Sequence, residues 1–234
     1  MTVNVLNFSD TTGKKLYETG VKKGVLYTMS GAVGAEHEYD VATIWNGLTS
    51  VSESPTGAES NALYADDVKY ADLMSTEEFE ATIGAYTYPK EFEACDGSKE
   101  LVDGSGVSAG QQARAVFGLS YVTTVGNDVD GNDHGYKIHL IYGAKASPSE
   151  KAYNTINDSP EAIEFSWSIT TTPVSIGDGF KPTASVVIDS TKADASKLKK
   201  LEEALYGKAE SSEDAGDGVS AYLPLPSELM AMFA

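Results

Sequence analysis

Short segments in which apolar and polar residues alternate constrain the fold of this chain more than any other feature. The clearest is IEFSWSI at 163–169, in which every second residue is apolar. The same alternation occurs in EFEATIGAY (78–86), VFGLSYV (116–122) and YKIHLIY (136–142), and more weakly at 24–30, 42–52, 67–73 and 184–190. A period of two is that of a β-strand with one buried face. Antiparallel sheets with one solvated face produce it, so we predict a mainly β (α+β) fold.

One amphipathic helix is predicted after these strands, near residues 194–206. Asp194 is a good N-cap residue, and Gly207 lies where a glycine usually ends a helix. Leu198, Leu201 and Leu205 fall on one helical face. We expect this helix to lie on the sheet of a single domain that spans residues 21–206.

Both ends of the chain are predicted to lie outside that domain. Residues 1–20 look loose and are expected to form an N-terminal arm, and residues 207–220 are acidic and Gly/Ser-rich, as in a flexible linker. Residues 221–234 are apolar again and are expected to form a C-terminal arm. An apolar segment needs a surface to bury against, either its own domain or a neighbouring subunit.

The segment GNDVDGNDHG, at 126–135, resembles a calcium-binding loop at first sight. Asp128, Asp130 and Asn132 fit the first three ligand positions of such a loop. However, Asp133 stands where the motif needs glycine, and His139 stands where it needs glutamate. The flanks also look like strands, not helices. The sequence therefore predicts a long hairpin loop with no metal.

Composition and motifs argue against an enzyme and against a protein that grips nucleic acid. The net charge is −18, which disfavours binding to phosphate backbones and permits a surface from which DNA is repelled. Cys95 is the only cysteine, the three histidines are scattered, and no nucleophile elbow, phosphate loop or dinucleotide motif occurs. We expect no cofactor, no metal and no membrane insertion. The N-terminus has no signal-peptide pattern, so we expect synthesis and residence in the cytoplasm.

Several long stretches resemble the major tail proteins of long-tailed bacteriophages. They are NALYADDVKYADL (61–73), residues 78–98, residues 110–167 and LPLPSELM (223–230). More closely, they are similar to the tail tube proteins of phages and prophages of Gram-positive bacteria. The resemblance implies a β-sandwich with a flanking helix, whose copies form rings of six around a channel. Stacked rings would then form a tube in the virion tail, assembled in the host cytoplasm.

The resemblance also implies the partners and the contact residues. The partners would be copies of the chain itself, other tail proteins at the tube ends, and phage DNA that passes through the lumen without specific binding. Contact between rings is expected at the hairpin loop and at the C-terminal arm. The loop residues are Asn127, Asp128, Val129, Asp130, Asn132 and Asp133, and the arm residues are Leu223, Pro224, Leu225, Pro226 and Leu229. Glu78, Glu80 and Glu164 lie opposite the apolar faces of their strands and are expected to face either the lumen or the solvent.

Three other functions compete with this one. A monomeric β-sandwich binding module, such as an adhesin or a carbohydrate-binding domain, would need an exposed aromatic platform, for which Trp45 and Trp167 are the available residues. A different virion component, such as a tail terminator or a head–tail joining protein, would form one ring without polymerising. An enzyme would need a convergent polar site, which the sequence does not show.

Overall fold

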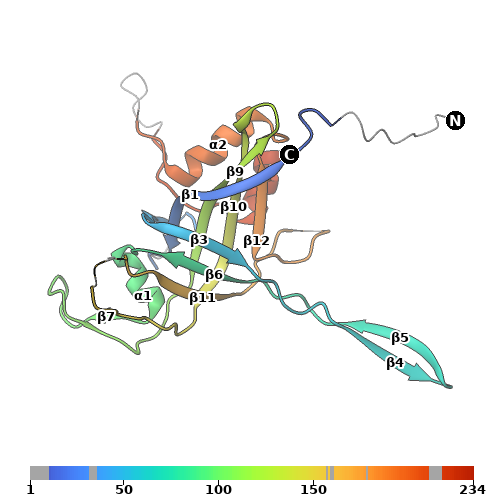
Figure 1. Cartoon of the computed structure of the whole chain (residues 1–234), viewed down its shortest axis with the longest axis horizontal. Helices are drawn as coiled ribbons and strands as arrows, with labels where there is room; N and C mark the ends of the chain where they lie inside the picture. Colours follow the sequence, from blue (N-terminus) through green and yellow to red (C-terminus); the bar gives the residue numbers. More distant parts are fainter. Residues whose placement is uncertain (1–10, 32–35, 157, 159–160, 178, 211–217) are drawn as a thin grey trace.

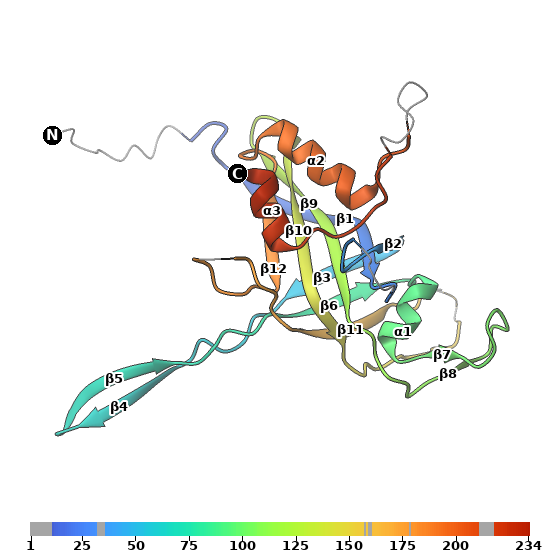
Figure 2. The same cartoon turned by 180° about the vertical axis from the view of Figure 1, so that it is seen from behind.

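The centre of the fold is an eight-stranded antiparallel sheet, seen from opposite sides in Figures 1 and 2. The computed structural model describes residues 11–31, 36–156, 158, 161–177, 179–210 and 218–234. The strand order is β2-β1-β9-β10-β11-β6-β3, and β12 pairs with β10 beside this path. The strands are β1 (Tyr17–Thr28), β2 (Val41–Ile44), β3 (Leu48–Glu53), β6 (Glu80–Ala85), β9 (Phe117–Asn127), β10 (Gly131–Ala146), β11 (Phe165–Thr171) and β12 (Ser185–Asp189). The predicted mainly β class is confirmed.

Strand β10 joins two halves of the sheet that face different ways. Up to Ile141 it pairs with β9 and β12; from Ala144, which still pairs with Phe117 of β9, strand β11 takes the place of β12. The register shifts between Ile141 and Ala144, at Gly143, whose φ is 59°. A Cβ atom on Gly143 would lie 2.2 Å from the carbonyl oxygen of Thr172, so only glycine fits this bend. The bend turns β11, β6 and β3 across the other half (Figure 1).

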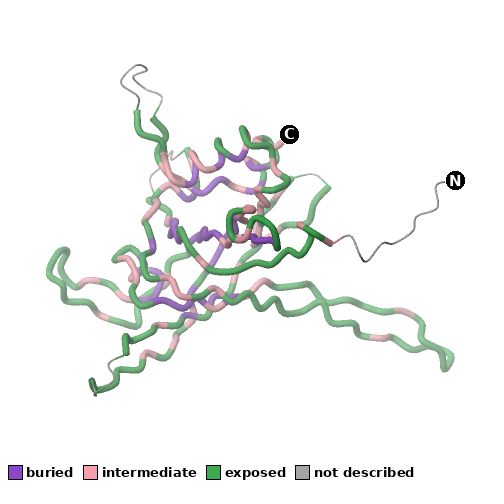
Figure 3. Tube along the Cα trace, turned by 45° about the horizontal axis from the view of Figure 1, so that its top comes forward, coloured by how far each residue is buried: buried purple, intermediate pink, exposed green. Residues whose placement is uncertain are grey.

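This folding creates two apolar cores on opposite sides of β9 and β10. The first lies between the halves and is built around Trp167, Phe92, Phe117 and Trp45. The second lies between the sheet and the C-terminal helices. Figure 3 shows the buried residues gathered at the centre of the fold. Because both faces of β10 are covered, Ile138 to Tyr142 are all buried, although the alternating sequence YKIHLIY predicts one solvated face.

Helix α2 (Ala195–Tyr206) occupies the position that the sequence predicts. The Asp194 side chain accepts hydrogen bonds from the backbone N–H groups of Ser196 and Lys197, which caps the first turn. Leu201 and Leu205 are fully buried against the sheet. The helix therefore covers the second core, as its leucine spacing indicates.

The C-terminal segment is not an extended arm in this structure. Its helix α3 (Pro226–Phe233) lies beside α2, and Leu223 and Leu229 are buried in the second core (Figure 2). Leu223 forms a backbone bridge with Tyr39, and the amine of Lys197 donates to the carbonyl oxygens of Phe233 and Ala234. Of the two surfaces expected to bury this apolar segment, its own domain is the one it uses here.

The other expected boundaries also differ from the structure. Strand β1 begins at Tyr17, so residues 17–20 belong to the sheet and not to an N-terminal arm. Residues 1–10, which make up half of that expected arm, lie outside the described part of the chain. So do residues 211–217 of the expected linker. The two ends of the linker meet, because Lys208 and Val219 exchange backbone hydrogen bonds of 2.8 and 2.9 Å.

A short helical segment closes the lower end of the first core. It consists of η1 (Lys90–Phe92) and α1 (Glu93–Asp96), followed by a small hairpin of β7 (Lys99–Glu100) and β8 (Ser108–Ala109). The Asp96 carboxylate is buried and accepts hydrogen bonds from the indole of Trp167 at 3.1 Å and the amine of Lys151 at 2.5 Å. A buried charge needs such partners.

The most prominent feature of the molecule is a two-stranded ribbon that projects far from the body. It consists of β4 (Ser60–Ala65) and β5 (Val68–Met74), joined by a turn at Asp66 and Asp67, which both have positive φ. Figures 1 and 2 show it in cyan, leaving the sheet where β3 ends and returning where β6 begins. We call residues 54–79 the ribbon arm. The sequence predicts a strand at 67–73 but gives no indication that it stands apart from the domain.

Candidate assembly surfaces

The strand pairing of the ribbon arm separates its residues into two faces. Directly opposed residues lie on the same face of an antiparallel pair. Asn61 opposes Leu73 and Leu63 opposes Ala71, while Ala62 opposes Asp72 on the other face. With Ala65 and Val68, which oppose each other at the turn, one face is almost entirely apolar.

Among the residues that the structure describes, none covers the apolar face of the ribbon arm. Leu63, Val68 and Leu73 are exposed, and Tyr70, which lies at the register shift without an opposed residue, is 77% exposed. The other face carries the ion pair of Lys69 with Asp72. An isolated two-stranded ribbon is marginally stable in water, and exposed apolar patches mark sites of protein contact. The ribbon arm therefore has the properties of an interaction element.

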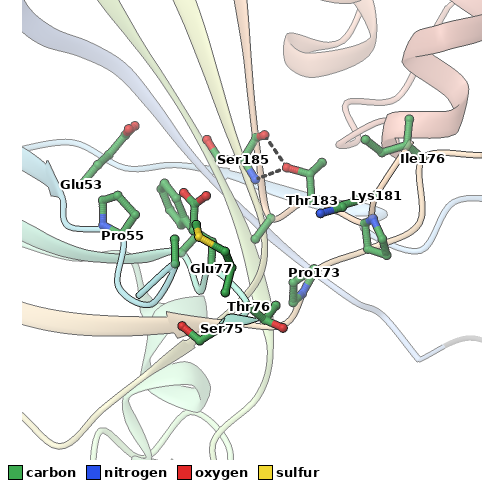
Figure 4. A pocket seen from close by; sticks show the side chains of 15 residues that line it. Glu53, Pro55, Ser75, Thr76, Glu77, Pro173, Ile176, Lys181, Thr183 and Ser185 are labelled. Carbon is green, nitrogen blue, oxygen red and sulfur yellow. Dashed lines mark hydrogen bonds between the residues drawn. The ribbon is translucent and has the colours of Figure 1, made fainter. Parts of the chain in front are cut away.

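The root of the ribbon arm borders an open groove of about 1320 Å³. Figure 4 shows Pro55, Thr76 and Glu77 of the root on one side of it, and Pro173, Ile176, Lys181 and Thr183 on the other. Thr183 and Ser185 hold that second wall through two hydrogen bonds between them. The root itself is anchored by Thr171, whose hydroxyl donates to the carbonyl oxygen of Phe79 at 2.7 Å, and by the Glu53 carboxylate, to which Tyr121 donates.

A second surface is the outer face of β3, β6 and β11, which points away from the first core. The register places Ser52, Thr82 and Ser168 in one row across the three strands, and Thr170 beside Glu80 in the next. Ser50, Ser52, Ser166, Ser168 and Thr170 are exposed. The three strands contain no lysine or arginine. Lys145 of β10 is exposed and opposes Thr170, so it lies at the margin of this face.

Two of the three acidic residues expected at the lumen or the solvent belong to this outer face. Glu80 is half-buried there. Glu164 is exposed just before β11, and its carboxylate accepts a hydrogen bond from Thr49. Glu78 is exposed at the root of the ribbon arm, where it bridges to Thr56. We call the exposed side of β3, β6 and β11, with Glu164, the hydroxyl face.

A third surface is the tip of the β9–β10 hairpin, which the sequence places at 126–135. Asn127 is buried, and its side-chain oxygen accepts from the backbone N–H groups of Val129 and Asp130. Its amide group lies 3.0 Å from both Asp130 and His134. Within the described residues, no group of His, Cys, Asp and Glu is arranged to hold a metal ion. Asn127 closes the loop internally, and Val129 remains exposed at its tip.

The family of the chain follows from a match along most of its length. The family model described as "Phage tail tube protein" matches residues 19–208. The chain belongs to the phage tail tube protein family. This confirms the resemblance noted from the sequence, and the protein is a structural component of a phage tail.

Two further comparisons, with curated protein sequences and with solved structures, say little more about this tail tube protein. No curated protein sequence matches it. Among solved structures it matches the tail tube of SPP1, determined by solid-state NMR and cryo-electron microscopy. That match has 11% sequence identity and a TM-score of 0.34, and covers 92% of this chain and 99% of the other.

Trp45 and Trp167, which a binding module would need as an exposed aromatic platform, do not form one in the tube protein. Trp45 and Trp167 are 2% and 0% exposed, and their rings pack against each other in the first core. The lone thiol, that of Cys95, is buried. Burial raises its pKa to about 12, so the reactive thiolate does not form at neutral pH. None of the helices in the described residues is long and apolar enough to cross a membrane.

The ribbon arm is the main candidate assembly element of the tube protein that the sequence does not predict. The pattern was present: Asn61, Leu63 and Ala65 alternate before the turn, and a second strand follows it. A periodic pattern shows that a strand has one apolar face. It does not show whether that face meets its own core or another molecule.

Proposed function

We propose that this tail tube protein assembles into rings of six subunits, which stack into a tube through which the phage genome passes into the host. The observation that carries the conduit role is the hydroxyl face. It is rich in serine and threonine, acidic through Glu80 and Glu164, and without a cation in its three strands.

Such a face suits a channel wall for DNA. A lysine or arginine in the wall would bind phosphates and slow the passage of the genome, whereas carboxylates repel them. Serine and threonine hydroxyls keep the wall hydrated with short side chains. We therefore assign Glu80 and Glu164 to the lumen and Glu78 to the root of the ribbon arm.

Closure of the ring is supported by the ends of the sheet. Strands β2 and β3 terminate the strand order, so each has one side without a partner within the described sheet. Unpaired edges promote aggregation unless they are covered or closed into a barrel. Pairing between copies would join the sheets of six subunits into one barrel, with the hydroxyl faces inside.

Stacking of the rings is supported by the ribbon arm and the hairpin tip. The apolar face of the ribbon arm would be buried against the next ring, and Val129 and its neighbours in the 127–133 loop would contribute a smaller contact. The exposed part of the C-terminal segment, including Met230, is available for the same purpose. A Val129→Asp variant is expected to polymerise less without losing stability.

The decisive experiment is electron microscopy of the purified protein over a concentration series. Hollow tubes of uniform diameter are expected. Isolated rings that never stack would instead indicate a single-ring virion component, and compact monomers at every concentration would contradict self-assembly.

The channel assignment has its own test. A Ser52→Lys/Ser168→Lys variant is expected to form normal tubes and tails but to release DNA slowly, measured as infectivity per assembled particle. The matched control is Thr155→Lys, at an exposed site outside β3, β6 and β11. Equal infectivity of the two variants would place the channel wall elsewhere.

A further inference from the structure

A single histidine lies at the centre of a cluster of charged and hydroxyl groups beside the ribbon arm. The side chain of His139, on β10, is 11% exposed and stacks on the ring of Tyr121 with centroids 4.6 Å apart. Its Nε2 atom lies 3.0 Å from the hydroxyl of Thr123 and 3.4 Å from a carboxylate oxygen of Glu18. On the opposite side, its Nδ1 atom lies 3.5 Å from a carboxylate oxygen of Glu53.

The hydrogen bonds around the ring fix which nitrogen of a neutral His139 carries its proton. The Thr123 hydroxyl has one hydrogen, and it donates that hydrogen to Glu18 at 2.5 Å. Nε2 must then donate to the hydroxyl oxygen. In a neutral imidazole this leaves a lone pair on Nδ1, which is buried, has no hydrogen-bond partner, and faces the negative Glu53.

Protonation of the ring removes this conflict. An imidazolium donates from both nitrogens, so Nδ1 can donate to Glu53 while Nε2 keeps its bond on the Glu18 side. The bond to Glu53 would then be charge-assisted, which is the stronger kind. The charged ring would join β3 to β1 across the β9–β10 hairpin.

The place of Glu53 in the chain gives this bond a mechanical role. Glu53 is the last residue of β3, and the ribbon arm begins at the next residue. Its register partner is Ala81, so its side chain lies on the inner side of the sheet, where it also accepts the hydroxyl of Tyr121 at 2.5 Å. On its other side, the root of the ribbon arm faces the open groove and the wall that contains Pro173, Ile176 and residues 181–185.

We propose that Glu18, His139 and Glu53 form a protonation-sensitive clamp that fixes the direction of the ribbon arm. The proposal rests on the proposed role of that arm in assembly. With His139 charged, this bond holds the root against β9 and β10. With His139 neutral, that bond is lost; the root keeps the bonds from Tyr121 and Thr171 and the backbone bond of Ser54 to Glu80, and it can swing more widely across the groove.

The other groups near the ring support this assignment. On β10 itself, the amine of Lys137 binds Glu18 at 2.5 Å. Strand β9 contributes only the hydroxyls of Tyr121 and Thr123, and burial raises the pKa of Tyr121, which keeps it a donor. On β12, the residue opposite His139 is the uncharged Val187. The ring therefore faces two carboxylates and one lysine that is already paired with Glu18.

The test measures the direction of the ribbon arm without requiring assembly. Spin labels are placed at Tyr70→Cys, on the arm, and Lys199→Cys, on α2, since Cys95 is buried and unreactive. Doubly labelled chains are diluted into unlabelled protein, and the distance distribution is measured by pulsed electron resonance at pH 8 and pH 5.5. Histidines in general change charge across this interval, and free carboxyl groups titrate below it.

In the parent chain, the distribution of distances between the two labels is expected to narrow clearly on acidification. In His139→Gln it is expected to stay broad at both pH values. The matched control is His134→Gln, in the hairpin tip, which is expected to narrow like the parent. Glu53→Gln provides a second variant, also expected to stay broad, should His139→Gln fail to fold.

Equal widths at both pH values in the parent, or narrowing that persists in His139→Gln or in Glu53→Gln, would overturn the clamp. Because the measurement uses the unassembled chain, a failure here is separate from a failure to form tubes in the microscope.

Discussion

The phenol of Tyr142 donates a hydrogen bond of 2.8 Å to the backbone carbonyl of Pro224, and this bond ties the C-terminal segment to the centre of the sheet. Tyr142 is fully buried, so its hydroxyl has no alternative partner in water. Removing the segment would leave an unsatisfied polar group and would expose the leucines of α2. The C-terminal segment is therefore part of the fold.

Truncation after Gly207 is consequently expected to destabilise the monomer. Leu223 and Leu229 are both buried, and each contributes about 1.5–3 kcal/mol through burial. Urea unfolding of the truncated chain should show a clearly lower midpoint, and Leu223→Ala alone should cost about 2–5 kcal/mol. Met230→Ala, at an exposed site of α3, is the control. An unchanged midpoint after truncation would show that the segment does not stabilise the domain.

The hairpin tip is expected to depend on one side chain. Asn127→Ala removes the acceptor of two backbone N–H groups and the donor to Asp130, so we expect a loss of about 1–3 kcal/mol of stability. Asp133→Ala, at an exposed position of the same loop, should change stability by less than about 0.5 kcal/mol. Thermal unfolding of the two variants compares them directly, and equal losses would refute the role of Asn127.

The ribbon arm is expected to serve assembly and not the stability of the monomer. In Leu63→Ser/Leu73→Ser, two exposed apolar side chains become polar, so the unfolding midpoint should stay within experimental error while polymer yield falls by at least an order of magnitude. Sedimentation measures the yield. Tyr64→Ser, which changes the opposite face of the same ribbon, is the control, and an equal loss in both variants would contradict a contact made by the apolar face.

Acidification below about pH 4.3 is expected to lower the stability that Glu53 and Glu18 contribute to the fold. The nearby His139 side chain, whose Nδ1 atom lies 3.5 Å from the carboxylate, is the largest cause of the lowered pKa of Glu53. For Glu18, burial alone would raise the pKa, but bonds from Lys137 and Thr123 lower it. A carboxyl whose pKa is lower in the folded state contributes stability above its unfolded pKa of about 4.3, and this is lost as the pH falls through the folded value.

Urea midpoints measured from pH 7 to pH 3 test that expectation. Glu53→Gln should lower stability at pH 7 and make its decline below about pH 4.3 shallower than in the parent. Glu91→Gln, an exposed carboxyl on η1, should leave the whole profile in place. Parallel profiles for the parent and Glu53→Gln would show that Glu53 carries no such linkage.

Part of the fold could be predicted from the sequence because local signals and tertiary structure agree. The alternation around Trp167 marks β11, and Asp194 and Gly207 bound α2 within one residue. The hairpin at 126–135 was predicted because the residues that fail the calcium motif are visible in the sequence.

The exposed ribbon arm and the docked C-terminal segment could not be predicted, because their placement depends on which surface each apolar segment packs against. Leu63 and Leu223 both lie in short apolar stretches, yet one is exposed on the ribbon arm and the other is buried under α2. The contacts of Glu53 and His139 join residues 86 positions apart on strands that are not neighbours in the sheet, and no local pattern records such a pair.

Strand β10, with its bend at Gly143, has a consequence for how the molecule unfolds. Its 16 residues supply hydrogen bonds to β9, β12 and β11, so neither half of the sheet can open fully while the other remains intact. The body should behave as one cooperative unit, with the amides of β10 among the slowest to exchange with deuterium. The ribbon arm shares none of that ladder, and its amides would exchange freely until a neighbouring subunit covers them.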